Sequence, residues 1–230
     1  MNNNFAQPAY HYRIDCMKPQ QLFPALSFIF CGLFLQKPLA LPQTSPLSAF
    51  SSAWNDARFL KCNTAANTSY LSKEEKDIIY ILNMARTDPA LFANTVVEKY
   101  PGFRNKPSLK DLPDYKSLLD TLRLVRALPL LYPDSICFES AKCHAISAGS
   151  LGYVGHERKT DQCKRSKHHQ GECCQYGYKD PLLVLMALFI DQNVPFHGHR
   201  FLCLSSYSKI GVSIQPHSAY GYNTVIDFYF

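Results

Sequence analysis

The sequence predicts an α+β fold in which helices pack on a small antiparallel sheet. Apolar residues recur at helical spacing through most of the stretch from residue 72 to residue 190. Residues 209–215 and 223–230 instead alternate as strands do, with a turn near Gly221 between them. Helices followed by an antiparallel pair are typical of the α+β class. A chain of 230 residues with 47% hydrophobic content can bury a sizeable core.

The first predicted helix begins at a capping box. The hydroxyl of Ser72 and the carboxylate of Glu75 are spaced to satisfy free backbone amides at a helix start. Apolar residues then follow on one helical face, at Ile78, Ile81, Leu82 and Ala85. This segment is therefore expected to pack one face into the core.

Aspartates mark the starts of three further helices. Asp88 and Asp180 each precede a proline, which is the arrangement of an N-cap followed by a first-turn proline. Asp134 is expected to cap a helix that ends at the glycines 149 and 152, and a short helix is expected near residues 118–125. The stretch 182–190 is so apolar that we expect it to lie in the core.

Residues 1–40 are predicted to be an N-terminal extension and a signal peptide. Residues 22–35 are almost wholly apolar and follow Lys18. Their number is below the roughly 20 that a membrane span needs, and it suits the hydrophobic region of a signal peptide. Translation from Met17 would give a signal of ordinary length. We therefore expect a secreted, cell-surface or periplasmic protein, and the alternative is an uncleaved anchor.

A change of composition marks the expected domain boundary. Residues 41–70 are rich in Pro, Ser, Thr, Ala and Asn, which predicts a linker or a loosely held lead-in. The compact domain is expected over residues 71–230. No internal repeat is found in the sequence.

Nine cysteines are many for a cytosolic chain, whereas secretion permits disulfides. Removal of residues 1–40 leaves an odd number of cysteines, so at least one thiol would stay unpaired or form an intermolecular bridge. We expect at least one disulfide that involves Cys163, Cys173 or Cys174. A metal site in the same Cys- and His-rich stretch is the alternative.

The net charge of +6 is mildly basic, and most of the basic residues are scattered. The one local cluster is read most simply as a solvated loop, and it consists of Lys159, Lys164, Arg165 and Lys167. No basic helical stripe is found, so nucleic-acid binding is disfavoured.

Two histidines and a glutamate, each preceded by glycine, form the candidate site. They are His156, Glu172 and His199. Glycine lets the backbone turn sharply, so loops can bring the three side chains to one spot. Two imidazoles and a carboxylate suit a divalent metal or acid–base chemistry. The alternative is that they only brace the fold through hydrogen bonds.

Several short motifs follow one another in an order that resembles the CAP superfamily. These are the SCP-like proteins, which include the cysteine-rich secretory and pathogenesis-related proteins. The bacterial branch of this superfamily is the most similar. The series is Leu82-Asn83-x-x-Arg86, Gly155-His156, Gly171-Glu172, Gly198-His199-Arg200 and Ile210-Gly211-Val212. The resemblance covers roughly residues 71–230. It implies a three-layer α-β-α sandwich and secretion.

The resemblance also implies a cleft lined by two histidines and two acidic residues. His156 and His199 match the histidines, and Glu172 matches one acid. The helix expected to supply the second acid carries no glutamate, so Asp191 is the candidate there. The metal ligands would then be His156 and His199, with Zn²⁺ or another divalent cation as the cofactor.

Other polar residues in the same motifs are expected to be structural. Asn83 and Arg86 should tie the first helix to neighbouring loops, and Arg200 should pair with an acid or cap a helix end. His144 is expected to be packed or hydrogen-bonded in the core. His197 should point away from His199 if the segment is extended.

Three functional classes remain open. The first is a secreted binding module whose polar cleft holds a divalent metal or a small ligand, such as a lipid. The second is a metal-dependent hydrolase or peptidase with Glu172 as the base. The third is a protein-interaction module. A non-enzymatic role is favoured, because no Gly-x-Ser-x-Gly or Cys/His nucleophile arrangement is found.

Overall fold

The computed structural model describes residues 44–230, so the predicted signal peptide and the candidate start at Met17 lie outside the described range. Its α-helices are α1 (Lys73–Thr87), α2 (Pro89–Phe92), α3 (Glu98–Phe103), α4 (Pro113–Leu124), α5 (Ser135–Leu151), α6 (Asp161–Arg165), α7 (Pro181–Ile190) and α8 (Gly198–Cys203). Its strands are β1 (Tyr132–Pro133), β2 (Gly171–Tyr176), β3 (Lys209–His217) and β4 (Gly221–Tyr229). A π-helical turn covers Ala93–Val97, and 3-10 turns cover Ser52–Asn55, Ala57–Cys62, Pro107–Asp111 and Pro195–His197.

The strands form one sheet in the order β1-β3-β4-β2. The predicted hairpin of β3 and β4 is confirmed, with its turn at residues 218–220, directly before Gly221. The sheet departs from the expectation in two ways. Residues 171–176 form a third antiparallel strand that the sequence did not reveal, and β1 adds to β3 in parallel. The sheet is therefore mixed rather than wholly antiparallel.

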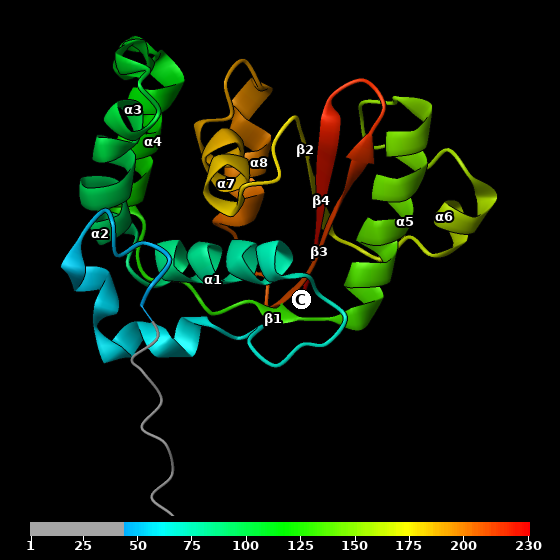
Figure 1. The fold of residues 1–230 in the computed structure, drawn as a ribbon, viewed down its shortest axis with the longest axis horizontal. Helices are drawn as coiled ribbons and strands as arrows, with labels where there is room; N and C mark the ends of the chain where they lie inside the picture. Colours follow the sequence, from blue (N-terminus) through cyan, green and yellow to red (C-terminus); the bar gives the residue numbers. More distant parts are fainter. Residues whose placement is uncertain (1–43) are drawn as a thin grey trace, which may run out of the picture. The chain divides into compact units, whose positions relative to one another are not determined.

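Helices cover both faces of the sheet, which gives the α+β, three-layer α-β-α arrangement that the sequence and its resemblance predicted (Figure 1). Helix α5 packs on one face, with α6 beside it. Helices α1, α7 and α8 pack on the other face. The main hydrophobic core lies between these helices and the sheet, and the apolar residues of α7 are part of it, as expected.

The predicted helix caps are confirmed. The Ser72 hydroxyl accepts the backbone N–H of Glu75, and the Glu75 carboxylate accepts the backbone N–H of Ser72. Asp88, Asp134 and Asp180 each accept backbone N–H groups at the starts of α2, α5 and α7. Each of these four helices therefore begins where a local side chain satisfies its free amides.

The expectation of a loosely held lead-in is corrected over residues 44–70. Ser51 and Asp56 cap two 3-10 turns in this stretch. Most of its large apolar side chains are buried, and Trp54 also donates a 2.9 Å hydrogen bond to Thr95. The polar composition concealed a segment that packs through Leu47, Trp54 and Phe59. None of the helices over residues 44–230 is long and apolar enough to cross a bilayer.

One predicted disulfide is confirmed. Cys143 on α5 is bonded to Cys163 on α6, across 20 residues of sequence. This pairing excludes Cys163 from the alternative metal site. Cys173 and Cys174 are buried free thiols, and burial raises the pKa of both well above the usual thiol value.

Arg86 and Asn83 have the structural roles expected of them. The fully buried guanidinium of Arg86 donates to backbone carbonyls of two separate segments. One acceptor is Pro129, and the others lie in the segment 203–207. Asn83 exchanges two hydrogen bonds with the backbone of Leu131. These contacts fix the chain that runs from α8 into β3.

Helix α5 approaches the sheet unusually closely because glycine occupies the contact. A Cβ atom at Gly211 on β3 would lie 2.2 Å from the backbone of Cys137 and Phe138 on α5. A Cβ atom at Gly149 on α5 would lie 2.0 Å from the carbonyl oxygen of Pro216. Any side chain at either position must push the helix away from the sheet.

We therefore predict that Gly211→Ala lowers the free energy of unfolding by about 1–3 kcal/mol, the usual cost of overpacking. Urea denaturation followed by circular dichroism measures the change. The matched control is Gly102→Ala on α3, where nothing lies within 4 Å of the added methyl group. An unchanged midpoint for Gly211→Ala would show that α5 tolerates displacement.

Candidate functional site

The two histidines of the predicted site lie side by side. His156 is in the loop that follows α5, and His199 is the second residue of α8. Their ring centroids are 6.1 Å apart, with the ring planes tilted by 37°. The His156 side chain is 57% exposed and that of His199 is 19% exposed, so solvent reaches the pair.

A buried glutamate orients His156. Glu172, on β2, accepts a 2.9 Å hydrogen bond from Nδ1 of His156, and its carboxylate is almost inaccessible to solvent. A carboxylate only accepts, so Nδ1 carries the proton and Nε2 keeps its lone pair when the ring is neutral. The same hydrogen bond raises the pKa of His156 above its ordinary value of 6.5, against the opposing effect of burial.

A buried aspartate orients His199 in the same manner. Asp191 follows the end of α7 in the left-handed conformation, with φ at 53°. One carboxylate oxygen accepts Nδ1 of His199 at 2.7 Å, and the other accepts the backbone N–H of His199 at 2.9 Å. Asp191 thereby holds the start of α8 and also leaves Nε2 of His199 free as an acceptor.

The arrangement is that of two carboxylate–histidine pairs whose Nε2 atoms have no hydrogen-bond partner among residues 44–230. Metal-bound histidines usually donate their second ring nitrogen to a carboxylate or a carbonyl group in this way. Because a Zn–N bond is about 2 Å long, a separation of 6.1 Å between the ring centroids is compatible with one ion shared by the two rings. All four residues of the predicted cleft, His156, Glu172, His199 and Asp191, are thus brought together.

Glu172 also belongs to a buried charge network that the sequence did not reveal. It lies directly opposite Asp227 in the pairing of β2 with β4. One guanidinium nitrogen of Arg158 lies 2.5 Å from Glu172 and 3.2 Å from Asp227. His169 lies 3.2 Å from the second oxygen of Asp227. Arg158 thus compensates the charge of both carboxylates. Without this compensation, two like charges would lie directly opposite each other in a place that water does not reach.

The two carboxylates respond differently to burial. Burial raises the pKa of Asp227, and the hydrogen bond from His169 only partly opposes this effect. Burial also acts to raise the pKa of Glu172. There the hydrogen bond from His156 and the charge of Arg158 prevail and lower the pKa. Glu172 is therefore the carboxylate that stays ionised to receive the proton of His156.

Two buried groups in the described part of the chain have ligand atoms close enough to hold a metal ion. One is His144, Glu172 and Cys174, and the other is His169, Glu172 and Asp227. In the second group, the Arg158 nitrogen lies within 3.2 Å of all three side chains and supplies the positive charge itself. In the first group, burial raises the pKa of Cys174, so its thiol is protonated when no ion is bound. The exposed pair His156 and His199 is the more accessible place for an ion.

Of the other two histidines with a predicted role, His144 behaves as predicted, whereas the segment of His197 is a 3-10 turn rather than extended. His144 is buried and bonds the carbonyl of Gly155 through Nε2 at 2.9 Å. His197 pairs with Asp114 at 2.8 Å and does not share a partner with His199. Arg200 is buried and donates to Phe189, Ser117 and other acceptors that hold α8 against α4 and α7. Arg158, His169 and Asp227 were not found from sequence motifs. Their role depends on contacts with side chains that are distant in the sequence, and no local pattern marks such contacts.

No family model, no curated protein and no solved structure matches this chain. The resemblance to the CAP superfamily therefore remains a prediction from the motif series.

We predict that His156 titrates above pH 6.5 in the metal-free protein because of its hydrogen bond to Glu172. NMR titration of the imidazole measures this pKa, and Glu172→Gln should lower it. Because the folded pKa exceeds the unfolded one, the protonated pair stabilises the fold below the unfolded pKa, and this contribution is lost as pH rises through the folded pKa. Asp191→Asn is the control that leaves this hydrogen bond in place. An unshifted His156 in the wild type would contradict the assignment.

We predict that Arg158→Met destabilises the fold by about 3–5 kcal/mol, because it leaves buried carboxylates without a compensating charge. Chemical denaturation measures the loss. The matched control is Arg123→Met, whose ion pair with Glu98 is exposed and should be worth less than about 1 kcal/mol. Adding Asp227→Asn to Arg158→Met should recover part of the loss. Equal effects of the two arginine changes would refute the role of Arg158.

Proposed function

We propose that this chain is a secreted CAP/SCP-like binding module in which His156 and His199 hold a divalent ion such as Zn²⁺. One observation carries the proposal: each imidazole donates Nδ1 to a buried carboxylate and leaves Nε2 free. Such pairs fix the tautomer that coordinates a metal. The ordered motif series supports the family assignment.

The ion would have two protein ligands and open coordination positions. Structural zinc sites in proteins are usually closed by four protein ligands. A site with two ligands leaves room for water or for a small ligand, including the polar group of a lipid. We therefore propose modest metal affinity and a role in binding.

A hydrolase is the less favoured reading of the same residues. A general base must reach the proton that it abstracts. The carboxylate of Glu172 is only 4% exposed and is engaged by His156 and Arg158. Its position suits orientation of the imidazole better than activation of a water molecule.

Secretion is supported by two features of different kinds. The apolar stretch before residue 40 suits a signal peptide. The Cys143–Cys163 bridge is compatible with an oxidising compartment. The ligand is proposed to be a small molecule, a lipid or a protein, with no nucleic acid and no stable membrane span after removal of the signal.

We predict that the wild type binds Zn²⁺ at pH 7.5 and that His156→Ala and His199→Ala each weaken binding at least about tenfold, because changing even the outer-shell partner of a ligand typically costs about 10–100-fold in affinity. Isothermal titration calorimetry measures the affinity. The control is His168→Ala, which removes a histidine that stacks on Tyr229. Binding should weaken as pH falls, with proton competition beginning above pH 6.5 because the pKa of His156 is raised.

The variants also separate the candidate sites. Cys174→Ser and His169→Ala each alter one of the two buried groups and leave both exposed imidazoles intact. They should retain the affinity of the wild type. Loss of binding in these variants, with retention in His156→Ala and His199→Ala, would overturn the proposed site.

A further inference from the structure

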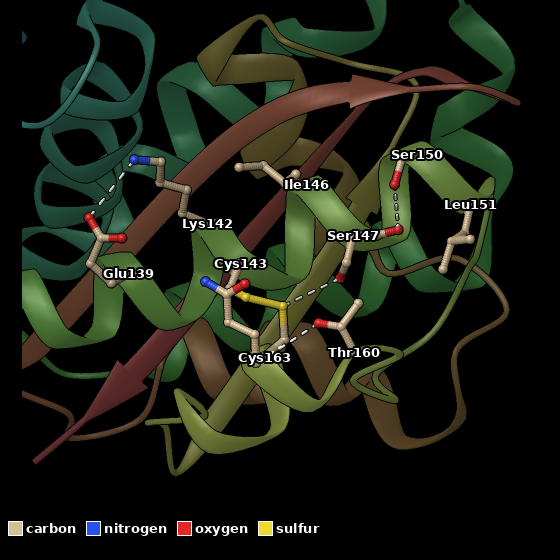
Figure 2. A pocket seen from close by; sticks show the side chains of 10 residues that line it. Glu139, Lys142, Cys143, Ile146, Ser147, Ser150, Leu151, Thr160 and Cys163 are labelled. Carbon is tan, nitrogen blue, oxygen red and sulfur yellow. Dashed lines mark hydrogen bonds and ion pairs between the residues drawn. A yellow bond between two sulfur atoms is a disulfide. The ribbon is translucent and has the colours of Figure 1, made fainter.

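A hollow lies between α5 and α6, and the Cys143–Cys163 disulfide forms part of its wall. This hollow has a volume of about 480 Å³ and lies over the outer side of α5 (Figure 2). Both sulfur-bearing residues line it, together with Ile146 and Leu151 from α5 and Thr160 from the loop before α6. A small molecule in this hollow can therefore approach the bond from solvent.

The two sulfur atoms have different surroundings. Cys163 is only 2% exposed, whereas Cys143 is half-buried. The hydroxyl oxygen of Ser147 lies 3.7 Å from Sγ of Cys163, within reach of a sulfur that becomes a thiolate. Lys164 follows Cys163 directly in α6. An incoming thiolate therefore reaches Cys143 more readily than Cys163, and Cys163 is the sulfur that leaves.

The basic cluster of the sequence lies close to Cys163 along the chain. Residues 157–167 carry four exposed cations and two exposed carboxylates, an excess of two positive charges. Two of the cations are paired, Lys159 with Glu157 and Lys164 with Asp161. Arg165 and Lys167 have no ion-pair partner in the described range 44–230. A positive environment favours the thiolate form of an incoming thiol and attracts a thiol that carries carboxylates.

The bond also closes the loop that supplies the candidate site. The chain between α5 and β2 carries His156, Arg158 and His169, and α6 lies within it. The link between Cys143 and Cys163 fixes the middle of this loop to α5. Opening of the bond would leave the loop attached mainly through its polar contacts.

We propose that the Cys143–Cys163 bond is a thiol–disulfide exchange site for a small anionic thiol of the glutathione type. The thiolate attacks Sγ of Cys143, a new sulfur–sulfur bond forms, and Cys163 leaves as a thiolate that takes a proton from solvent. A second thiolate then attacks the mixed disulfide and releases the oxidised thiol dimer together with the Cys143 thiolate. Two small thiols are oxidised and one protein disulfide is reduced.

Exchange at this bond regulates the metal site, a consequence that rests on the proposed function. Once Cys163 is released, the loop can move and His156 loses its fixed position against Glu172. The reduced protein therefore binds Zn²⁺ more weakly than the oxidised protein. The exchange itself does not depend on metal binding.

The test is the reaction of the folded full-length protein with glutathione, followed by mass spectrometry of peptides under non-reducing conditions. We expect a mixed disulfide on Cys143 under native conditions. Cysteamine, a cationic thiol, is the comparison. At equal thiolate concentration, glutathione should react roughly tenfold faster, the lower end of electrostatic rate effects. No adduct without denaturant, an adduct on Cys163, or equal rates for the two thiols would overturn the proposal.

Matched variants test the role of charge. Arg165→Gln combined with Lys167→Gln should remove most of the preference for glutathione, whereas Lys61→Gln combined with Lys76→Gln, remote in sequence, should retain it. Retention of the preference in the first pair would also overturn the proposal. Calorimetry with Zn²⁺ on the oxidised and glutathione-treated protein then tests regulation. A wild type that binds no Zn²⁺ refutes the proposed function alone, and equal Zn²⁺ affinities refute the regulation.

Discussion

The position of Arg158 between Glu172 and Asp227 is the interaction on which the site depends. The two carboxylates face each other on neighbouring strands and are buried, so their repulsion is not screened by water. One guanidinium nitrogen contacts both of them. This arrangement lets Glu172 remain ionised. The ionised carboxylate accepts the hydrogen bond from Nδ1 of His156 and thereby fixes the orientation of the imidazole ring.

The close approach of α5 to the sheet makes this buried network possible. Glycine at the contact brings the helix backbone next to β3, and Ala141 and Ala145 are the small residues that it presents to the sheet. The opposite face of the sheet packs on large apolar side chains from α1 and α7. The sheet therefore has one apolar face, which contributes most of the hydrophobic core, and one face where Ser140 and Asp227 form a buried hydrogen bond.

The sequence by itself determined the elements whose signals are local. The capping box at Ser72 and the aspartates before α2, α5 and α7 set the helix starts, because each cap acts on amides within three residues. Alternation predicted β3 and β4. The glycines before His156, Glu172 and His199 marked these three candidates, and the resemblance pointed to Asp191 as the second acid.

Only the tertiary structure decided which groups share a proton or a charge. Asp191 reaches His199 through a left-handed turn, and Glu172 reaches His156 from a strand that carried no strand signal. Arg158 and Asp227 are 69 residues apart and meet only because β2 pairs with β4 beneath α5. Likewise, the polar lead-in became part of the core through Trp54. Local sequence fixes hydrogen bonds within a turn of chain, whereas buried charges are paired by whichever distant segments the folded backbone brings together.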